Sequence, residues 1–251
     1  MAENKTSSDF PTTRWTLLRQ LDGGDSAWEK AMEEICQRYW LPVYAFLRQR
    51  GASPADAEDL TQSFFAKLIK SDNLRSVREG EGKLRSYLLA AVQNENVDQW
   101  RKDHAQRRGG DVSVISFEQD VAEERYHEFA STDDTPDEVF DRGWFTSVVE
   151  EAKRQLRQSL KNRGREEAFE VMEKYLLVDA RGEEAEATAQ KLGITTGSLR
   201  VTLHRFREKF RSIVRERLGE TVTDESELSA EMAYFCQLGF DNEIFPDANA
   251  V

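Results

Sequence analysis

Residues 189–207 read AQKLGITTGSLRVTLHRFR and decide the class of fold. Leu192 and Ile194 flank Gly193, a residue type that readily adopts the positive φ with which many helices end. Thr195 then offers a side-chain oxygen to the free N–H groups at the start of a second helix. The stretch therefore predicts a helix, a tight turn and a second helix.

The second helix of this pair has an apolar stripe and a basic outer surface. Leu199, Leu203 and Phe206 recur at helical spacing and are expected to pack inward. The basic residues left for the outer faces are Arg200, His204, Arg205, Arg207 and Lys209. This layout is typical of a helix-turn-helix whose second helix lies in the major groove of DNA. A helical hairpin with a solvated basic surface would show the same pattern.

The length of 251 residues allows one large domain or two small ones. The chain has no run of 18 apolar residues and no apolar signal core near its polar N-terminus, so we expect a cytoplasmic protein without membrane contact. Cys36 and Cys236 lie far apart and outside any CxxC pair, which argues against a disulfide framework and a zinc site. We therefore expect no metal and no other cofactor.

The net charge of −12 is unevenly distributed along the chain. Residues 111–141 hold eleven acidic residues and one basic residue, and residues 219–251 hold eight acidic residues and no Lys or Arg. Residues 196–217, in contrast, hold seven Lys or Arg and two Glu. Because local charge sets the attraction to phosphates, the acidic total is compatible with a nucleic-acid partner.

Helical patterns dominate, so the sequence predicts an all-α fold with two small helical domains joined by an acidic linker. We expect the first domain at residues 1–108, the linker at 109–138 with one short helix around 119–129, and the helix-turn-helix domain at 139–218. An acidic extension, 219–251, contains a short amphipathic helix. That helix either completes the core of the second domain or covers a DNA-binding face as an inhibitor.

Caps and spacing predict the individual helices. Ser53-Pro54 is a strong start for a helix over residues 54–70, whereas Pro42 predicts a kink or a boundary within residues 26–50. The other expected helices cover residues 83–104, 137–162, 165–179, 183–192 and 196–217.

Three acidic residues, Asp56, Glu58 and Asp59, lie at the start of the helix over residues 54–70. One or two of them suit the positive end of the helix dipole. Three acids followed by apolar residues also suit a docking rim for a basic partner, and spacing leaves the two interpretations equally open. A catalytic or metal role is not expected, because the acids diverge around the helix and no histidine lies nearby.

The predicted helix over residues 83–104 ends in amide, aromatic and basic residues. They are Asn94, Asn96, Asp98, Gln99, Trp100, Arg101 and Lys102, with Arg107 and Arg108 beyond the helix. Such residues suit a surface that holds unstacked bases and phosphates, although, for this segment taken alone, a solvated helix face with Trp100 in the core is the better explanation. The motifs GxxxxGK[ST], GxGxxG, HExxH and GxSxG are absent, so we do not expect an enzyme.

In this order the motifs resemble those of bacterial RNA polymerase sigma factors of the extracytoplasmic-function (ECF) type. DAEDLTQSFF (residues 56–65) is similar to the family's acidic motif. GEGKLRSYLLAAVQN (80–94) and DQWR (98–101) are similar to its promoter-melting segment, and residues 189–207 to its helix-turn-helix. The resemblance covers residues 27–108 and 140–218. The linker is longer and more acidic than is usual in the family, and the chain continues for 33 residues beyond Leu218.

The resemblance implies a non-catalytic promoter-specificity subunit that joins core RNA polymerase and helps to open the duplex. Asp56, Glu58 and Asp59 would contact the β′ subunit, with the β subunit as a second partner. Implied contacts to the minus-ten element of promoter DNA come from Asn94, Arg101, Lys102, Arg107 and Arg108. Implied contacts to the minus-thirty-five element come from Thr196, Ser198, Arg200, His204, Arg205 and Lys209. The alternative is a helix-turn-helix regulator that does not join polymerase.

A further similarity concerns regulation. Residues 39–48, YWLPVYAFLR, resemble a subgroup found near serine/threonine kinase genes. A serine/threonine kinase and an anti-sigma factor are therefore additional candidate partners. Thr61, beside the acidic motif, is a candidate phosphorylation site, because a phosphate there would add negative charge to the docking rim.

Overall fold

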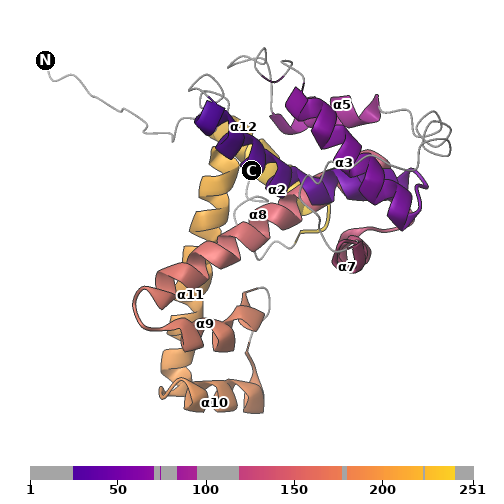
Figure 1. The fold of residues 1–251 in the computed structure, drawn as a ribbon. Helices are drawn as coiled ribbons and strands as arrows, with labels where there is room; N and C mark the ends of the chain where they lie inside the picture. The colour runs from indigo at the N-terminus through magenta and orange to yellow at the C-terminus, as the bar shows by residue number, and fades with distance from the viewer. Residues whose placement is uncertain are drawn as a thin grey trace, which may run out of the picture. The chain divides into compact units, whose positions relative to one another are not determined.

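The computed structural model describes residues 25–70, 74, 84–94, 119–176, 180–222 and 224–240. Within these residues every regular element is helical (Figure 1), which confirms the predicted all-α class. The described residues form two compact units, one ending at Ser147 and the other beginning at Val148. We call them the N-terminal unit and the C-terminal unit.

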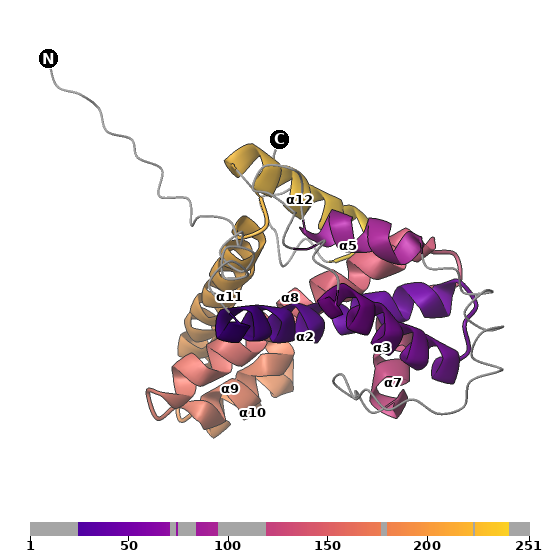
Figure 2. The same ribbon diagram turned by 45° about the horizontal axis from the view of Figure 1, so that its top comes forward.

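A helical pair forms the centre of the N-terminal unit. Helices α2 (Asp25–Gln49) and α3 (Pro54–Lys70) are joined by a short turn and lie side by side in Figures 1 and 2. Every side chain from Tyr39 to Leu47 is buried, which makes this part of α2 the middle of the core. The helix runs through Pro42, so the boundary that the proline predicts is absent.

Three further helical segments surround this pair: α5 (Leu84–Gln93), α7 (Gln119–Phe129) and the first part of α8 (Pro136–Lys161). Trp144 of α8 is buried beneath the Arg85 guanidinium, whose central carbon lies 4.8 Å from the ring centroid. The Arg85 Nε is also 3.3 Å from a carboxylate oxygen of Asp141. A buried cation thus joins α5 to α8 through an ion pair and an aromatic ring.

A capping box fixes the start of α8. The Thr135 N–H donates to Glu138 Oε2 at 2.8 Å, and the Glu138 N–H donates to Thr135 Oγ1 at 3.3 Å. This reciprocal pair satisfies two N–H groups that a helix start otherwise leaves free. The predicted helix over residues 137–162 is therefore confirmed with almost the expected bounds.

The C-terminal unit contains the remainder of α8 and five further helical elements among the described residues. They are α9 (Glu166–Met172), the 3-10 turn η1 (Glu173–Tyr175), α10 (Gly182–Lys191), α11 (Thr196–Gly219) and α12 (Glu225–Gln237). Phe169 and Phe206 meet edge to face with ring centroids 5.9 Å apart, an arrangement that aromatic pairs favour. In Figure 1, α10 lies crosswise to α11.

The division into units differs from the predicted domain bounds. Helix α7 and the first part of α8 were expected to be linker and second domain, yet both belong to the N-terminal unit. The predicted extension is likewise not separate, because α12 packs on α11 and buries Leu228, Met232 and Phe235. Tertiary contacts between segments far apart in sequence, rather than local composition, set these bounds.

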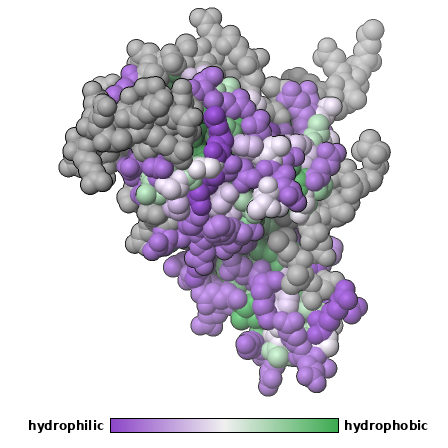
Figure 3. Space-filling view, turned by 90° about the vertical axis from the view of Figure 1, so that its right-hand side faces the viewer, coloured by the Kyte–Doolittle hydropathy of each residue, from purple (hydrophilic) through white to green (hydrophobic). Residues whose placement is uncertain are grey.

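The described surface is largely polar. On the face shown in Figure 3 hydrophilic residues predominate, and apolar areas are small. No helix in the described part of the chain is long and apolar enough to cross a bilayer.

Candidate functional site

The acidic start of α3 presents its three carboxylates in different directions. Ser53 Oγ accepts the Asp56 N–H at 3.2 Å, which is the predicted N-terminal cap. Asp59 is exposed at the centre of the outer face, opposite the buried stripe, whereas Asp56 and Glu58 are half-buried on its two sides. Burial and the charge of Asp59 raise the pKa of Glu58. The arrangement forms a negatively charged rim with no point at which the carboxylates converge.

Thr61 lies on the opposite face of α3. Its side chain is fully buried, and its Oγ1 donates to the carbonyl oxygen of Ala57 at 2.7 Å. A kinase has no access to this hydroxyl while α3 is folded, and a phosphate would require charge to be buried in the core. The structure therefore argues against Thr61 as a phosphorylation site.

Beside this helix, an ion pair anchors α7 to the end of α2. Glu123 of α7 accepts hydrogen bonds from Arg48 Nε at 2.8 Å, Arg48 Nη2 at 2.6 Å and the Tyr44 hydroxyl at 2.6 Å. Arg48 also contacts the Ala52 carbonyl oxygen, and its guanidinium lies 5.4 Å from the centroid of the Tyr126 ring. These bonds hold the Glu123 carboxylate in its charged form and lower its pKa to about 2.

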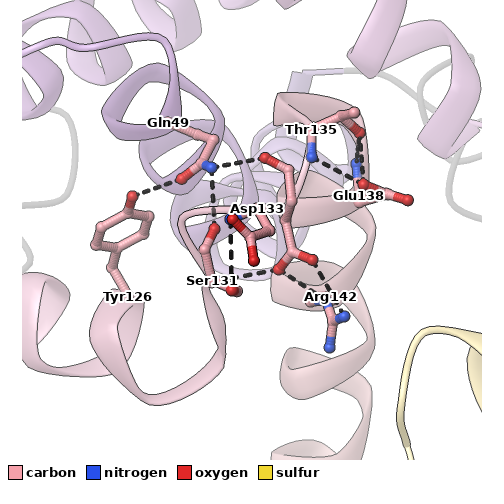
Figure 4. A network of polar contacts seen from close by, with 8 residues as sticks. Gln49, Tyr126, Ser131, Asp133, Thr135, Glu138 and Arg142 are labelled. Atoms are coloured by element: carbon pink, nitrogen blue, oxygen red, sulfur yellow. Dashed lines mark hydrogen bonds and ion pairs between the residues drawn. The ribbon is translucent and has the colours of Figure 1, made fainter.

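A second set of polar contacts fixes the loop between α7 and α8 (Figure 4). The Gln49 amide donates to the carbonyl oxygens of Ser131 at 3.0 Å and Asp134 at 2.7 Å. The Tyr126 hydroxyl donates to Gln49 Oε1 at 2.7 Å, and Arg142 Nε lies 3.2 Å from Asp134 Oδ2. Sequence reasoning missed the Arg48–Glu123 pair and the bonds of Gln49, because the partners are 75 to 85 residues apart and share no local motif.

The end of α5 carries the one described residue of the predicted minus-ten set. The Asn94 side chain is exposed, and its Nδ2 donates to the carbonyl oxygen of Ala90 at 2.9 Å. The preceding Gln93 is tied to the start of α8, where its amide donates to the Asp137 carboxylate at 2.9 and 3.0 Å. Arg101, Lys102, Arg107 and Arg108 lie outside the described residues, as does the expected continuation of the helix to residue 104.

In the C-terminal unit a tight turn joins α10 to α11 at the predicted positions. Gly193 has a φ of 65°, and the Ile194 N–H donates to the Ala189 carbonyl oxygen at 3.0 Å, so that the glycine closes the end of α10. The Thr195 side chain accepts the Ser198 N–H at 3.2 Å and caps α11. Leu199, as well as the other two residues of the predicted apolar stripe, is buried.

The cations of α11 divide into two groups. Four arginines, at positions 207, 211, 215 and 217, contact acidic or carbonyl oxygens. The Arg207 Nε donates to the Tyr175 carbonyl oxygen at 2.7 Å, and Arg211 pairs with Glu208 at 2.7 Å. Arg215 contacts Glu225 of α12, and Arg217 pairs with Glu220 at 2.9 Å.

The second group is exposed. All six residues of the predicted minus-thirty-five set lie at the surface: Thr196, Ser198, Arg200, His204, Arg205 and Lys209. Among the described residues, Arg200, Arg205 and Lys209 have no acidic partner. The positive charge of α11 without an acidic partner therefore lies between Arg200 and Lys209. Such a surface attracts phosphates more strongly than the total charge of the chain suggests.

The chemistry of the described residues offers little to catalysis. No group of three or more His, Cys, Asp or Glu among them is arranged to hold a metal ion. Both cysteines are free thiols, and burial raises the pKa of Cys36 to about 12 and also raises that of Cys236. A thiol with a raised pKa is a weak nucleophile, so these residues act as small apolar side chains.

Comparison with known families assigns part of the N-terminal unit. Residues 35–106 match the family model of Sigma-70 region 2, a span that contains the acidic start of α3 and Asn94. The match supports a factor of the sigma-70 family and points to promoter recognition by RNA polymerase. Such factors are non-enzymatic initiation proteins. No curated protein and no solved structure matches the chain.

Proposed function

We propose that the chain is a sigma factor of the ECF type, which confers promoter recognition on core RNA polymerase and assists promoter melting. The match of residues 35–106 to Sigma-70 region 2 is the observation that carries this proposal. The exposed cations Arg200, Arg205 and Lys209 of α11 support a second DNA contact outside the matched region. A protein with one contact in each unit would recognise two promoter elements.

The rim of Asp56, Glu58 and Asp59 is the proposed contact with the β′ subunit of core polymerase. A capped helix start with an exposed carboxylate at its centre offers charge to a basic partner without burying an unpaired ion. Burial raises the pKa of Glu58, with a smaller contribution from the charge of Asp59, and a cationic partner would stabilise the charged form of Glu58. The rim therefore suits a basic surface of the partner.

Asn94 is the proposed reader of an unstacked base of the minus-ten element. Its amide offers one further donor and an acceptor beyond the bond to Ala90, and these fit the edge of a single base. Its place at the end of α5 is fixed, because Gln93 is held by Asp137 and by Arg50 Nη1, which donates to the Gln93 carbonyl oxygen at 3.2 Å. Arg101, Lys102, Arg107 and Arg108 are proposed to hold the neighbouring phosphates.

The part of α11 from Thr196 to Lys209 is the proposed reader of the minus-thirty-five element. Arg200, His204 and Arg205 lie around the exposed face and suit guanine edges or phosphates. Thr196 and Ser198 at the helix start suit a phosphate. Lys209 lies about three turns beyond Ser198 and suits the DNA backbone.

Helix α12 is proposed to complete the core of the C-terminal unit rather than to inhibit it. Leu228 reaches the end of α11, where its Cδ2 would lie 4.0 Å from a Cβ added to Gly219. Arg215, which α12 engages through Glu225 and through Met232 Sδ at 3.4 Å, is outside the proposed DNA-reading set. Within the described residues, α12 therefore leaves the exposed cations of α11 uncovered.

The test is reconstitution of the full chain with core RNA polymerase, followed by in vitro transcription from a library of genomic promoter fragments. We expect stable co-purification and initiation at a discrete class of promoters. Replacing Asp56, Glu58 and Asp59 together by alanine should weaken core binding at least tenfold, because three rim charges at about 0.5–1 kcal/mol each are removed. Glu167→Gln, an exposed acid in the first turn of α9, is the matched control.

Three outcomes separate the alternatives. Failure of the wild-type chain to bind core polymerase, together with sequence-specific DNA binding on its own, would identify a helix-turn-helix regulator instead. Equal core binding by the triple variant and the wild-type chain would remove the docking assignment. Loss of binding in Glu167→Gln would mean that the assay reports general charge rather than the rim.

A further inference from the structure

The most exposed large apolar side chain of the described residues lies among the cations of α11. Val201 is 52% exposed, and the other exposed large apolar residue of the described chain, Val121 on α7, is 38% exposed. Val201 directly follows Arg200 and precedes His204 and Arg205. A single exposed valine is common on protein surfaces, and what distinguishes Val201 is its place among exposed cations on the helix proposed to contact DNA.

The position of Val201 around the helix is central. Successive residues of a helix are about 100° apart, and the buried stripe is formed by Leu199, Leu203 and Phe206. On that spacing Val201 lies almost opposite the stripe, with Arg200 on one side and Arg205 on the other. Val201 therefore lies near the centre of the face that α11 would present to a groove, about two turns before the exposed Glu208.

The chemistry of the major groove supplies a fitting contact. Each A·T pair presents the C5-methyl group of thymine there, and apolar side chains recognise that group by contact. The flanking cations would hold the phosphates and guanine edges on either side, so that the valine is pressed against the base pairs between them. The major groove presents apolar methyl groups between negatively charged phosphates. A helix face with an apolar centre and flanking cations therefore matches the groove better than a uniformly charged or uniformly apolar face would.

We propose that Val201 reads the C5-methyl group of a thymine within the DNA element bound by α11. The assignment rests on the proposed function of α11 and adds one base identity to it. Val201 would then favour thymine over cytosine and over uracil at a single position of the promoter, independently of any hydrogen bond.

The experiment uses the full chain assembled with core polymerase on a promoter fragment selected by that complex. Each thymine of the upstream element is replaced in turn by 2′-deoxyuridine, which removes the methyl group and leaves the base-pairing edge unchanged. At one thymine we expect the affinity of the wild-type complex to fall about fourfold, the effect of one apolar group returned to water. The Val201→Ser complex should respond to the same replacement by less than about 1.5-fold, because the contact is already lost.

Val201→Ile and Val121→Ser are the matched controls. The first keeps an apolar side chain and should retain the response to deoxyuridine. The second removes the other exposed valine and should also leave the response unchanged. Serine and valine have similar helix propensities, and the site is exposed, so Val201→Ser is expected to fold.

Each result bears on the proposal. A wild-type complex that binds the promoter but responds to no deoxyuridine would overturn it, as would an equal response in the wild-type and Val201→Ser complexes. Loss of core-polymerase binding by Val201→Ser would also overturn it, because the valine would then contact protein. Failure of the wild-type chain to bind promoter DNA at all would instead refute the proposed function on which the assignment rests.

Discussion

Replacing Glu123 by glutamine removes the charge that anchors α7 to the end of α2. The wild-type carboxylate accepts three hydrogen bonds, two from Arg48 and one from the Tyr44 hydroxyl. Glutamine keeps one oxygen but turns a second acceptor into a donor that faces the guanidinium. We therefore expect the N-terminal unit to lose stability.

The size of the loss follows from the pKa of Glu123. Its ordinary value of 4.5 falls to about 2, chiefly because Arg48 donates hydrogen bonds to the carboxylate. At 1.36 kcal/mol for each pKa unit, the folded state favours the charged form by about 3 kcal/mol. The two side chains are only 17% and 21% exposed, so solvent screens the pair weakly. We expect Glu123→Gln to lower the free energy of unfolding by about 2–3 kcal/mol.

The same pair has a defined pH dependence. Because the pKa of Glu123 is lower in the folded state than in the unfolded chain, its contribution is fully present above about pH 4.5. The contribution declines as the pH falls from about 4.5 towards 2, where the carboxylate becomes protonated in the folded state. The difference in stability between wild type and Glu123→Gln should therefore shrink over that range.

The measurement is hydrogen exchange of the buried amides of α2, with and without urea. Glu124→Gln is the matched control, because Glu124 is exposed on the same helix and the substitution changes the net charge equally. We expect the control to cost less than about 0.5 kcal/mol. Equal losses in Glu123→Gln and Glu124→Gln at pH 7 would refute the anchoring role of the pair.

Three further predictions concern packing and backbone conformation, and urea unfolding checks each of them. Gly193→Ala should destabilise the C-terminal unit by about 1–2 kcal/mol, because its φ of 65° is unfavourable for a residue with a Cβ. Gly197→Ala, whose new Cβ would make only an ordinary contact with Thr195 Oγ1 at 4.0 Å, should instead stabilise the unit by about 0.5–1 kcal/mol, and a stabilising Gly193→Ala would contradict the turn. Phe235→Ala should cost about 3–4 kcal/mol if α12 is part of the core, whereas a cost below about 1 kcal/mol would mean that α12 is dispensable. Gly143→Ala should destabilise the N-terminal unit by about 1 kcal/mol, because the new Cβ would lie 3.2 Å from both the Phe129 ring and the Pro42 Cα, and an unchanged midpoint would contradict this close packing of α8 on α2.

Much of the secondary structure was predictable because its causes are local. The start of α3 at Pro54, the turn at Gly193 and the cap at Thr195 depend on residues within four positions of each other. The apolar stripe of α11 follows from helical spacing, and the structure buries the residues that the spacing selects. The exposed set on α11 was predictable for the same reason.

The domain bounds, the burial of Thr61 and the partners of the α11 cations were not predictable from local sequence. Composition alone gave no reason to join the acidic α7 to the N-terminal unit, because its anchor, Arg48, lies 75 residues away from Glu123. Thr61 follows directly after the acidic motif in sequence, yet the helical turn directs it into the core. The seven cations of α11 look alike in the sequence, but within the described residues the fold places acidic or carbonyl oxygens beside only four of them, Arg207, Arg211, Arg215 and Arg217.

The sequence by itself therefore determined the all-α class, the helix starts and which face of each helix is apolar, since these depend on spacing and on caps within a few residues. Only the tertiary structure decided which charges are neutralised and which remain exposed, because an ion pair depends on the distance between two side chains in space and not on their separation along the chain.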